Sequence, residues 1–276
     1  MANPPRSIRQ CLERFCWPAL IVVLTCVAFA PVVHNQFVNW DDRRLILENP
    51  NIRGLGWDQI RWMFTTFYMG SYPPLSWLSY AVDYHFWGLN PLGFHLTNVF
   101  LHVANALVFY GVTSSLFARA CSWSSDKVRF GAAVAALLFA VHPLRVESVV
   151  WAAERRDVLS GFFFLLSLEF YVRFLNREAT GRRTWGWYGA ALVAYAGSLL
   201  SKATAVGLPL ILLALDVFPF RRHGTENKRW FGLVTGRNLF EKVPYVVLAG
   251  LLTIVTFRAQ SQDRNVVPLA THGPLS

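Results

Sequence analysis

The apolar run WPALIVVLTCVAFAPVV (residues 17–33) is followed closely by FVNWDDRR (residues 37–44), which contains two adjacent carboxylates. A helix of about 20 apolar residues can span a membrane, so Asp41 and Asp42 are predicted to lie just outside a membrane boundary. Adjacent acids repel each other, and a nearby medium of low dielectric raises the pKa of one of them, which suits a general base or a metal ligand. The alternative is a solvated loop whose acids are neutralised by the two arginines that follow.

The composition indicates a membrane protein. Of the 276 residues, 54% are hydrophobic and only 15% are charged, whereas soluble domains carry about 25% charged residues. Seven apolar runs approach or reach spanning length, and they cover residues 17–33, 96–118, 130–141, 158–175, 185–200, 203–220 and 243–257. The predicted fold is therefore an all-α, multi-pass bundle of about seven transmembrane helices.

The distribution of Lys and Arg predicts the orientation of this bundle. Most of them fall in segments that are cytoplasmic if the N-terminus is cytoplasmic, as the positive-inside rule requires. Residues 34–95 and 142–157 then form the first and second extracytoplasmic loops. The net charge of +10 is explained by this asymmetry, and no nucleic-acid partner is needed to account for it. We expect an integral protein of a bacterial inner membrane or of the endoplasmic reticulum.

One part of the first loop has the pattern of an amphipathic helix. Bulky apolar residues recur there at helical spacing, with charged residues between them: Trp57, Ile60, Phe64 and Phe67. Such a helix is expected to lie on the outer membrane surface. It would either cover a lipid substrate as a lid or simply cover the ends of the spanning helices.

The second apolar run carries a polar stripe. Four residues at positions i, i+3, i+7 and i+10 fall on one helical face, and they are His95, Asn98, His102 and Asn105. Polar side chains are costly in lipid, so this face should meet protein or a water-filled cavity. The stripe either makes interhelical hydrogen bonds without any chemistry or places His95 in the same cavity as Asp41 and Asp42.

The second loop concentrates charge beside the membrane. Arg145, Arg155 and Arg156 could converge on an anion, since the planar guanidinium group makes paired hydrogen bonds to phosphate. The alternative is that these arginines pair with neighbouring glutamates as surface ions. Lys202, at a tight outer turn, could face the same phosphate or simply extend into water.

Several motifs in a fixed order resemble the GT-C type of membrane glycosyltransferase. They are FVNWDD (37–42), GLNP (88–91) with HLTN (95–98), HPL (142–144), ERRDVLS (154–160) and SKAT (201–204). The chain is most similar to the transmembrane O-mannosyltransferases that act on cadherins, and to bacterial multi-pass proteins that continue into tetratricopeptide repeats. Such enzymes usually have more helices, so the resemblance implies that residues 1–276 are one truncated transmembrane domain.

The resemblance also implies substrates and site residues. A sugar, expected to be mannose, would pass from a dolichyl or undecaprenyl phosphate to a Ser or Thr hydroxyl of a protein. Asp41 and Asp42 would form the catalytic acid pair. The donor phosphate would be held by Arg145, Arg155, Arg156 and Lys202, and the cavity would be lined by His95, Asn98, His102, His142 and Glu147. Arg145 and Ala203 stand where related proteins often have other residues.

This likeness leads to a mechanistic expectation. Asp41 takes the proton of the acceptor hydroxyl as its oxygen attacks the anomeric carbon, and the phosphate leaves from the opposite face with inversion. Asp42 orients Asp41 or binds a divalent metal ion. The competing class is a non-catalytic membrane scaffold or a transporter. A transporter should show pseudo-symmetric halves with broken helices near the midplane, whereas the charge clusters here gather at one surface.

Overall fold

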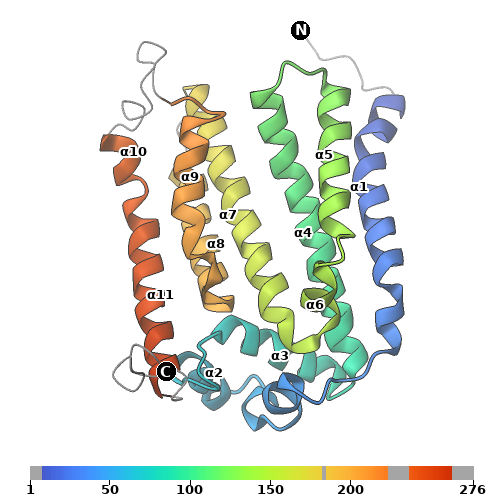
Figure 1. The fold of residues 1–276 in the computed structure, drawn as a ribbon, viewed down its shortest axis with the longest axis vertical. Coiled ribbons are helices and arrows are strands. Elements are labelled where there is room, and N and C mark those ends of the chain that lie inside the picture. Colours follow the sequence, from blue (N-terminus) through green and yellow to red (C-terminus); the bar gives the residue numbers. More distant parts are fainter. Residues whose placement is uncertain (1–7, 182–184, 223–235, 263–276) are drawn as a thin grey trace, which may run out of the picture.

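The computed structural model describes residues 8–181, 185–222 and 236–262. Within these ranges the regular elements are helices, and the only strand-like feature is a single antiparallel bridge between Tyr68 and Ser71 (Figure 1). The long helices are α1 (Ile8–Phe29), α4 (Pro91–Ala120), α5 (Ser125–Ala140), α7 (Arg155–Ala179), α8 (Trp185–Ser201), α9 (Leu208–Val217) and α11 (Val243–Gln262).

Shorter helical segments connect the long helices. They are η1 (Ala30–His34), the π-helix η2 (Arg43–Leu47), η3 (Pro50–Ile52), α2 (Trp57–Thr65), α3 (Pro74–Trp87), α6 (Arg145–Val150), η4 (Ala152–Glu154), η5 (Ala203–Gly207) and α10 (Gly236–Phe240). Figure 1 shows the long helices running alongside one another, with α2, α3 and α6 gathered at one end of the bundle.

Four of the described segments are long and apolar enough to cross a membrane: Phe15–His34, Pro91–Ala120, Ala152–Ala179 and Asn238–Gln262. The expectation of an all-α membrane protein is therefore met. The remaining predicted runs form α5, α8 and the segment Ala203–Val217, which are shorter than 18 residues. The total of about seven spanning helices consequently stays a prediction, and so does the orientation of the bundle.

The two predicted loops meet at the same end of the bundle. We call this end, formed by residues 35–90 and 141–157, the loop end. There Tyr80 Oη donates to the carbonyl oxygen of Ala153 at 2.7 Å, and Ser76 Oγ donates to the carbonyl oxygen of Ser201 at 2.9 Å. The first loop is thus hydrogen-bonded both to the second loop and to the end of α8.

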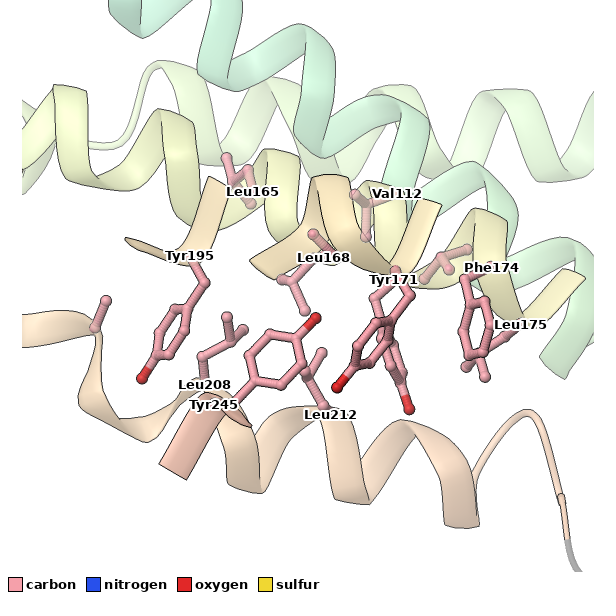
Figure 2. Packing of buried hydrophobic residues seen from close by; sticks show 14 of the residues in the cluster. Val112, Leu165, Leu168, Tyr171, Phe174, Leu175, Tyr195, Leu208, Leu212 and Tyr245 are labelled. Carbon is pink, nitrogen blue, oxygen red and sulfur yellow. The ribbon is translucent and has the colours of Figure 1, made fainter. Parts of the chain in front are cut away.

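Two of the four apolar cores formed by the described residues are larger than the others. The larger lies among α7, α8, α9 and α11, where Tyr171, Tyr195 and Tyr245 are buried beside Leu208 and Leu212 (Figure 2). The second core fills the loop end, and its members include Ile46, Met63, Trp77, Tyr80 and Phe94. Because burial of large aromatic side chains contributes strongly to stability, the first loop is a packed unit rather than a free connection.

A helix forms where the amphipathic pattern predicts one. It covers Trp57–Thr65 and ends before Phe67. Its buried face is provided by Met63, whereas Trp57 is 76% exposed and Phe64 is 40% exposed. These two exposed side chains are the ones available to a membrane surface, and a contact of α2 with the membrane stays a prediction.

The turn between α3 and α4 depends on a glycine. Asn90 caps α4 by accepting a hydrogen bond from the Leu92 N–H at 3.1 Å, and Pro91 occupies the first helical position. A Cβ atom added at Gly93 would lie 2.2 Å from Trp87 Cγ and 2.7 Å from Trp87 Cβ. Rotation of the indole ring cannot remove the second contact, so the two helices approach this closely only with glycine.

We therefore expect Gly93→Ala to lower the thermal unfolding midpoint in detergent. The matched control is Gly189→Ala in α8, where nothing lies within 4 Å of the added Cβ. Alanine favours a helix over glycine by about 1 kcal/mol, so the control should leave the midpoint unchanged or raise it. Circular dichroism during heating measures both variants, and equal midpoints would contradict the proposed close contact.

Candidate active site

The two adjacent aspartates have different environments. Asp42 is 0% exposed, and its two carboxylate oxygens accept backbone hydrogen bonds from Val38 at 2.8 Å and from Ala153 at 2.7 Å. Burial raises the pKa of Asp42, although these hydrogen bonds act in the opposite direction. Since both oxygens are engaged inside the protein, Asp42 joins the first loop to η4. Asp42, predicted as the member of the acid pair that orients Asp41 or binds a metal ion, thus uses both oxygens to hold the backbone beside Asp41.

Asp41 faces the other way and remains accessible. Its side chain is 24% exposed, and its Oδ2 lies 3.4 Å from Arg156 Nη2. Of the acid pair, Asp41 is therefore the member that a substrate can reach.

A chain of charged side chains extends from Asp41 across the loop end. We call Asp41, Arg156, Glu154, Lys202 and Asp157 the ionic cluster. Arg156 Nε donates to Glu154 Oε1 at 3.1 Å, and Lys202 Nζ donates to Glu154 Oε2 at 3.1 Å. Lys202 also forms an ion pair with Asp157. Three separate parts of the sequence, near residues 41, 155 and 202, thus meet in one polar group.

Glu154 is the centre of this cluster, and the sequence predicts no role for it in the site. Its side chain is 8% exposed, and it contacts both cations at once. Buried acids are stable only when paired, so Glu154 fixes the separation of the two cations. Arg156 is still 24% exposed and Lys202 is 27% exposed, which leaves both able to meet a ligand.

Arg155 points into the protein. It is 0% exposed, with Nη1 at 2.5 Å from Asp83 Oδ2 and Nε at 2.6 Å from Asn98 Oδ1. Its Nη2 donates to the carbonyl oxygen of Phe94 at 2.6 Å, and its guanidinium lies 5.3 Å from the Tyr80 ring centroid. Arg155 therefore joins α3, α4 and α7, and these contacts engage the guanidinium group that was predicted to hold a phosphate.

Asp83 is the partner that the sequence analysis missed. Burial raises the pKa of its carboxyl, while the adjacent Arg155 guanidinium acts to lower it. The signal for this residue was available, since Asp83 is the only carboxylate in the largely apolar helix α3.

The polar stripe of α4 binds backbone. Asn98 Nδ2 donates to the carbonyl oxygens of Val149 and Trp151 at 3.2 and 3.0 Å. His102 Nε2 lies 2.8 Å from the Ala140 carbonyl oxygen. Of the two alternatives for the stripe, hydrogen bonding inside the protein is the one that these residues adopt.

The residues at the two ends of the stripe, Asn105 and His95, are also buried. Asn105 Nδ2 donates to the carbonyl oxygen of Val158 at 2.9 Å. His95 is buried, and its ring lies 6.5 Å from the ring of Phe37. His95 is thereby packed against Phe37 of the first loop, and Phe37 lies four residues before Asp41 in the sequence.

Three predicted site residues of the second loop are exposed. His142 Nδ1 accepts a hydrogen bond from the Leu144 N–H at 3.2 Å, and Glu147 is exposed on α6. Arg145 lies over the ring of Phe139, 4.7 Å from its centroid. The structure does not bring His142 and Glu147 to the ionic cluster.

Two cavities flank the ionic cluster. The larger, of about 650 Å³, lies among α4, α5, α7 and η5 and is lined at its polar part by Arg145, Ser148 and Asp157; we call it the α4–α7 cavity. The smaller, of about 290 Å³, is lined by Arg156, Lys202 and the turn at residues 70–73; we call it the turn cavity. Thr204 lines both cavities. His102 and Asn105 also line the larger one, whereas His95 and Asn98 line neither.

Residues 15–181, 185–222 and 236–262 contain no group of three or more His, Cys, Asp or Glu side chains that could hold a metal ion. Asp42, the expected metal ligand, uses both oxygens for backbone hydrogen bonds.

We expect Asp83→Asn to destabilise the protein by roughly 3–5 kcal/mol, because it leaves the buried Arg155 charge without its partner. The control is Glu48→Gln, which breaks a pair with Arg43 whose side chains are 52% and 60% exposed and should change stability by about 1 kcal/mol or less. Thermal or denaturant unfolding in detergent compares the two. Equal losses would mean that the Arg155 contacts do not hold α3, α4 and α7 together.

Comparison with known proteins gives the relatives of the chain. It is 35% identical over 218 residues to the protein O-mannosyl-transferase Tmtc1 of Drosophila melanogaster, covering 73% of this chain and 23% of the relative. It is 31% identical over 225 residues to TMTC4 of Homo sapiens (74% and 30%) and 37% identical over 152 residues to tmtc2 of Xenopus laevis (55% and 17%), both also named protein O-mannosyl-transferases.

The matched regions thus span less than a third of the length of these relatives. No protein-family model and no solved structure matches the sequence. The motifs that contain Asp41, Arg156 and Lys202 resemble those of O-mannosyltransferases. The sequence identities agree with that resemblance. The chain is accordingly a relative of the TMTC protein O-mannosyl-transferases.

Proposed function

We propose that this chain carries the reaction centre of an enzyme that transfers mannose from a polyprenyl-phosphate donor to a Ser or Thr hydroxyl of a protein. The loop end is assigned to the extracytoplasmic or lumenal side. The observation that carries the proposal is the position of Asp41, a part-exposed carboxylate 3.4 Å from Arg156 in a cluster that also contains Lys202. The relatives, all named protein O-mannosyl-transferases, support the same activity.

In this proposal Asp41 is the general base. It accepts the proton of the acceptor hydroxyl while the hydroxyl oxygen forms a bond to the anomeric carbon of the sugar. The bond between that carbon and the phosphate oxygen breaks, and the polyprenyl phosphate leaves with the bonding electrons. A negative carboxylate beside the reacting carbon also stabilises positive charge that develops on the sugar ring. The configuration at the anomeric carbon is inverted.

Arg156 and Lys202 are assigned to the leaving phosphate. Both line the turn cavity and both are partly exposed, so their remaining donors can stabilise the charge that grows on the phosphate as the bond breaks. Arg145, which lines the α4–α7 cavity near Asp157, is a third candidate. Arg155 has no part in this set, because its donors are used inside the protein.

Glu154 and Asp157 are assigned to positioning the cations. The ionic cluster contains three carboxylates and two cations, so a bound phosphate must share Arg156 and Lys202 with the acids that already hold them. A shared cation can stabilise the transition state without binding the donor so tightly that the product phosphate is retained.

Asp42 is assigned a positioning role beside Asp41. Its hydrogen bonds to Val38 and Ala153 fix the backbone on both sides of the reaction centre. This division keeps one of the two roles predicted for Asp42, that of orienting Asp41. The carboxylates of the two acids contact different parts of the protein. Repulsion between the two charges is therefore not the main influence on either acid.

A membrane scaffold with no catalysis is the alternative. A scaffold would not require a part-exposed acid beside two part-exposed cations, whereas a transferase would. The following measurements separate the two functions.

We expect Asp41→Asn to reduce transfer of labelled mannose from a polyprenyl-phosphate donor to membrane proteins by about 100-fold or more, because the general base is lost. Membranes containing wild type and variant at equal expression are compared. Asp58→Asn, an exposed acid on α2, is the matched control and should transfer normally. Normal transfer by the Asp41 variant would rule out its role as base, and no transfer by any of the three proteins would favour the scaffold.

We also expect Lys202→Gln and Arg156→Gln to lower turnover more than they lower the unfolding midpoint. Each removes a cation from the leaving phosphate, while both side chains are partly exposed and contribute modestly to packing. Transfer rates at saturating donor, set beside unfolding in detergent, check this expectation. A loss of activity that is matched by an equal loss of folded protein would point to a structural role instead.

A further inference from the structure

Another large cavity lies at the end of the bundle opposite the loop end. We call this end, formed by residues 119–129, 173–181 and 185–188, the basic end; α7 runs to it from the loop end (Figure 1). The cavity has a volume of about 750 Å³, in the range of sites that hold small organic ligands. We call it the α7–α8 cavity, because the end of α7 and the start of α8 line it with Arg173, Asn176, Arg177, Thr180 and Trp187.

The residues that α7 contributes to this cavity share one face of the helix. Beginning with Arg173, they stand at positions i, i+3, i+4 and i+7. Two arginines one turn apart repel each other and weaken the helix unless an anion neutralises them. The five lining residues include no acid, so the charge of the lining is positive.

The acids near the cavity belong to other contacts. Glu178 Oε2 lies 2.6 Å from Arg222 Nη2, and Glu178 points about 100° away from Arg177 around the helix axis. Glu169 lies one turn before Arg173, and its Oε1 accepts a hydrogen bond from Arg173 Nε at 2.7 Å. This bond leaves both Nη groups of Arg173 without a hydrogen-bond partner among the described residues, so they remain available to a ligand.

The other polar groups of the lining can also meet a ligand. The Arg173 guanidinium lies over the Trp187 ring, 5.1 Å from its centroid, which holds it against α8. Within residues 8–181, 185–222 and 236–262, the exposed side chain of Arg177 and the amide of Asn176 form no hydrogen bond or ion pair. The Thr180 hydroxyl donates to the Arg177 carbonyl oxygen at 2.8 Å, so its own oxygen can accept from a ligand hydroxyl.

The position of the cavity indicates the source of the ligand. The segment Ala152–Ala179 is long and apolar enough to cross a membrane, and Arg173 and Arg177 belong to its last two turns. Tryptophan is enriched where a membrane meets water, and Trp187 lines the same cavity from α8. In the predicted orientation the basic end is cytoplasmic. Basic pockets between spanning helices on that side suit the headgroups of anionic lipids.

We propose that the α7–α8 cavity binds the headgroup of an anionic phospholipid. The free N–H donors of Arg173 and Arg177 bind the phosphate oxygens, because the planar guanidinium group matches two of them at once. Asn176 and Thr180 contact hydroxyl groups of the headgroup. A headgroup that carries an ammonium group would add a positive charge beside two arginines and is disfavoured. This lipid site does not depend on the proposed transfer reaction, which is assigned to the other end of the bundle.

The experiment titrates the full chain in detergent with dioctanoyl phosphatidylglycerol and measures bound lipid by native mass spectrometry. We expect dioctanoyl phosphatidylcholine, which has the same acyl chains, to bind at least about fivefold more weakly. Combining Arg173→Gln with Arg177→Gln should weaken phosphatidylglycerol binding at least about tenfold, because both cations hold the phosphate. The matched control is Lys127→Gln, which removes an exposed cation from the basic end outside the cavity and should change the affinity less than about twofold.

Excess inorganic phosphate, compared with chloride at the same ionic strength, separates a lipid site from a site for a free anion. We expect it to leave phosphatidylglycerol bound, and displacement by phosphate alone would overturn the lipid assignment. An equal loss of affinity in Lys127→Gln and in the double variant would also overturn it, since the attraction would then come from the general charge of the basic end. Equal binding of the two lipids by the wild-type protein would do the same, and that comparison requires no variant to fold.

Discussion

Backbone carbonyl groups that lie between α5 and α7 impose the constraint on which the loop end depends. This part of the chain breaks its regular helix at Val141 and again at Trp151, so several carbonyls lack a helical partner. Such groups are tolerated next to a membrane only when the protein itself satisfies them. From one face of α4, the Asn98 amide and the His102 ring meet three such carbonyls, those of Ala140, Val149 and Trp151. The Asn105 amide adds a bond to the carbonyl of Val158 in the first turn of α7.

The same constraint fixes the start of α7, where the charged residues are. Once Asn98 holds Val149 and Trp151, the segment that follows must enter α7 in one orientation. Successive residues of a helix point about 100° apart, so two adjacent arginines cannot share an environment. Arg155 is directed to Asp83 and Asn98 in the interior, and Arg156 is directed to Glu154 and Asp41 at the partly exposed surface.

The two adjacent aspartates likewise have different environments, since Asp42 is buried and Asp41 is partly exposed. Asp42 is used to hold Ala153, which immediately precedes Glu154, while Asp41 contacts Arg156. Each pair of like residues thus has one member that builds the loop end and one that remains available to a ligand. Trp77, Tyr80 and Phe94 pack together in the apolar core of the loop end. This packing keeps the ionic cluster in a fixed geometry, which a site that positions two substrates requires.

The sequence by itself determined the helical membrane class, the two charged segments and the stripe of four polar residues on α4. These properties follow from hydropathy and helical periodicity, which are local. The sequence also placed Asp41, Arg156 and Lys202 among the candidates by their motifs. Only the tertiary structure decided which member of each like-charged pair is buried, that Asp83 and Glu154 are their partners, and that the stripe binds backbone. Those outcomes depend on which carbonyls and charges from distant segments meet, and neither periodicity nor spacing along the chain contains that information.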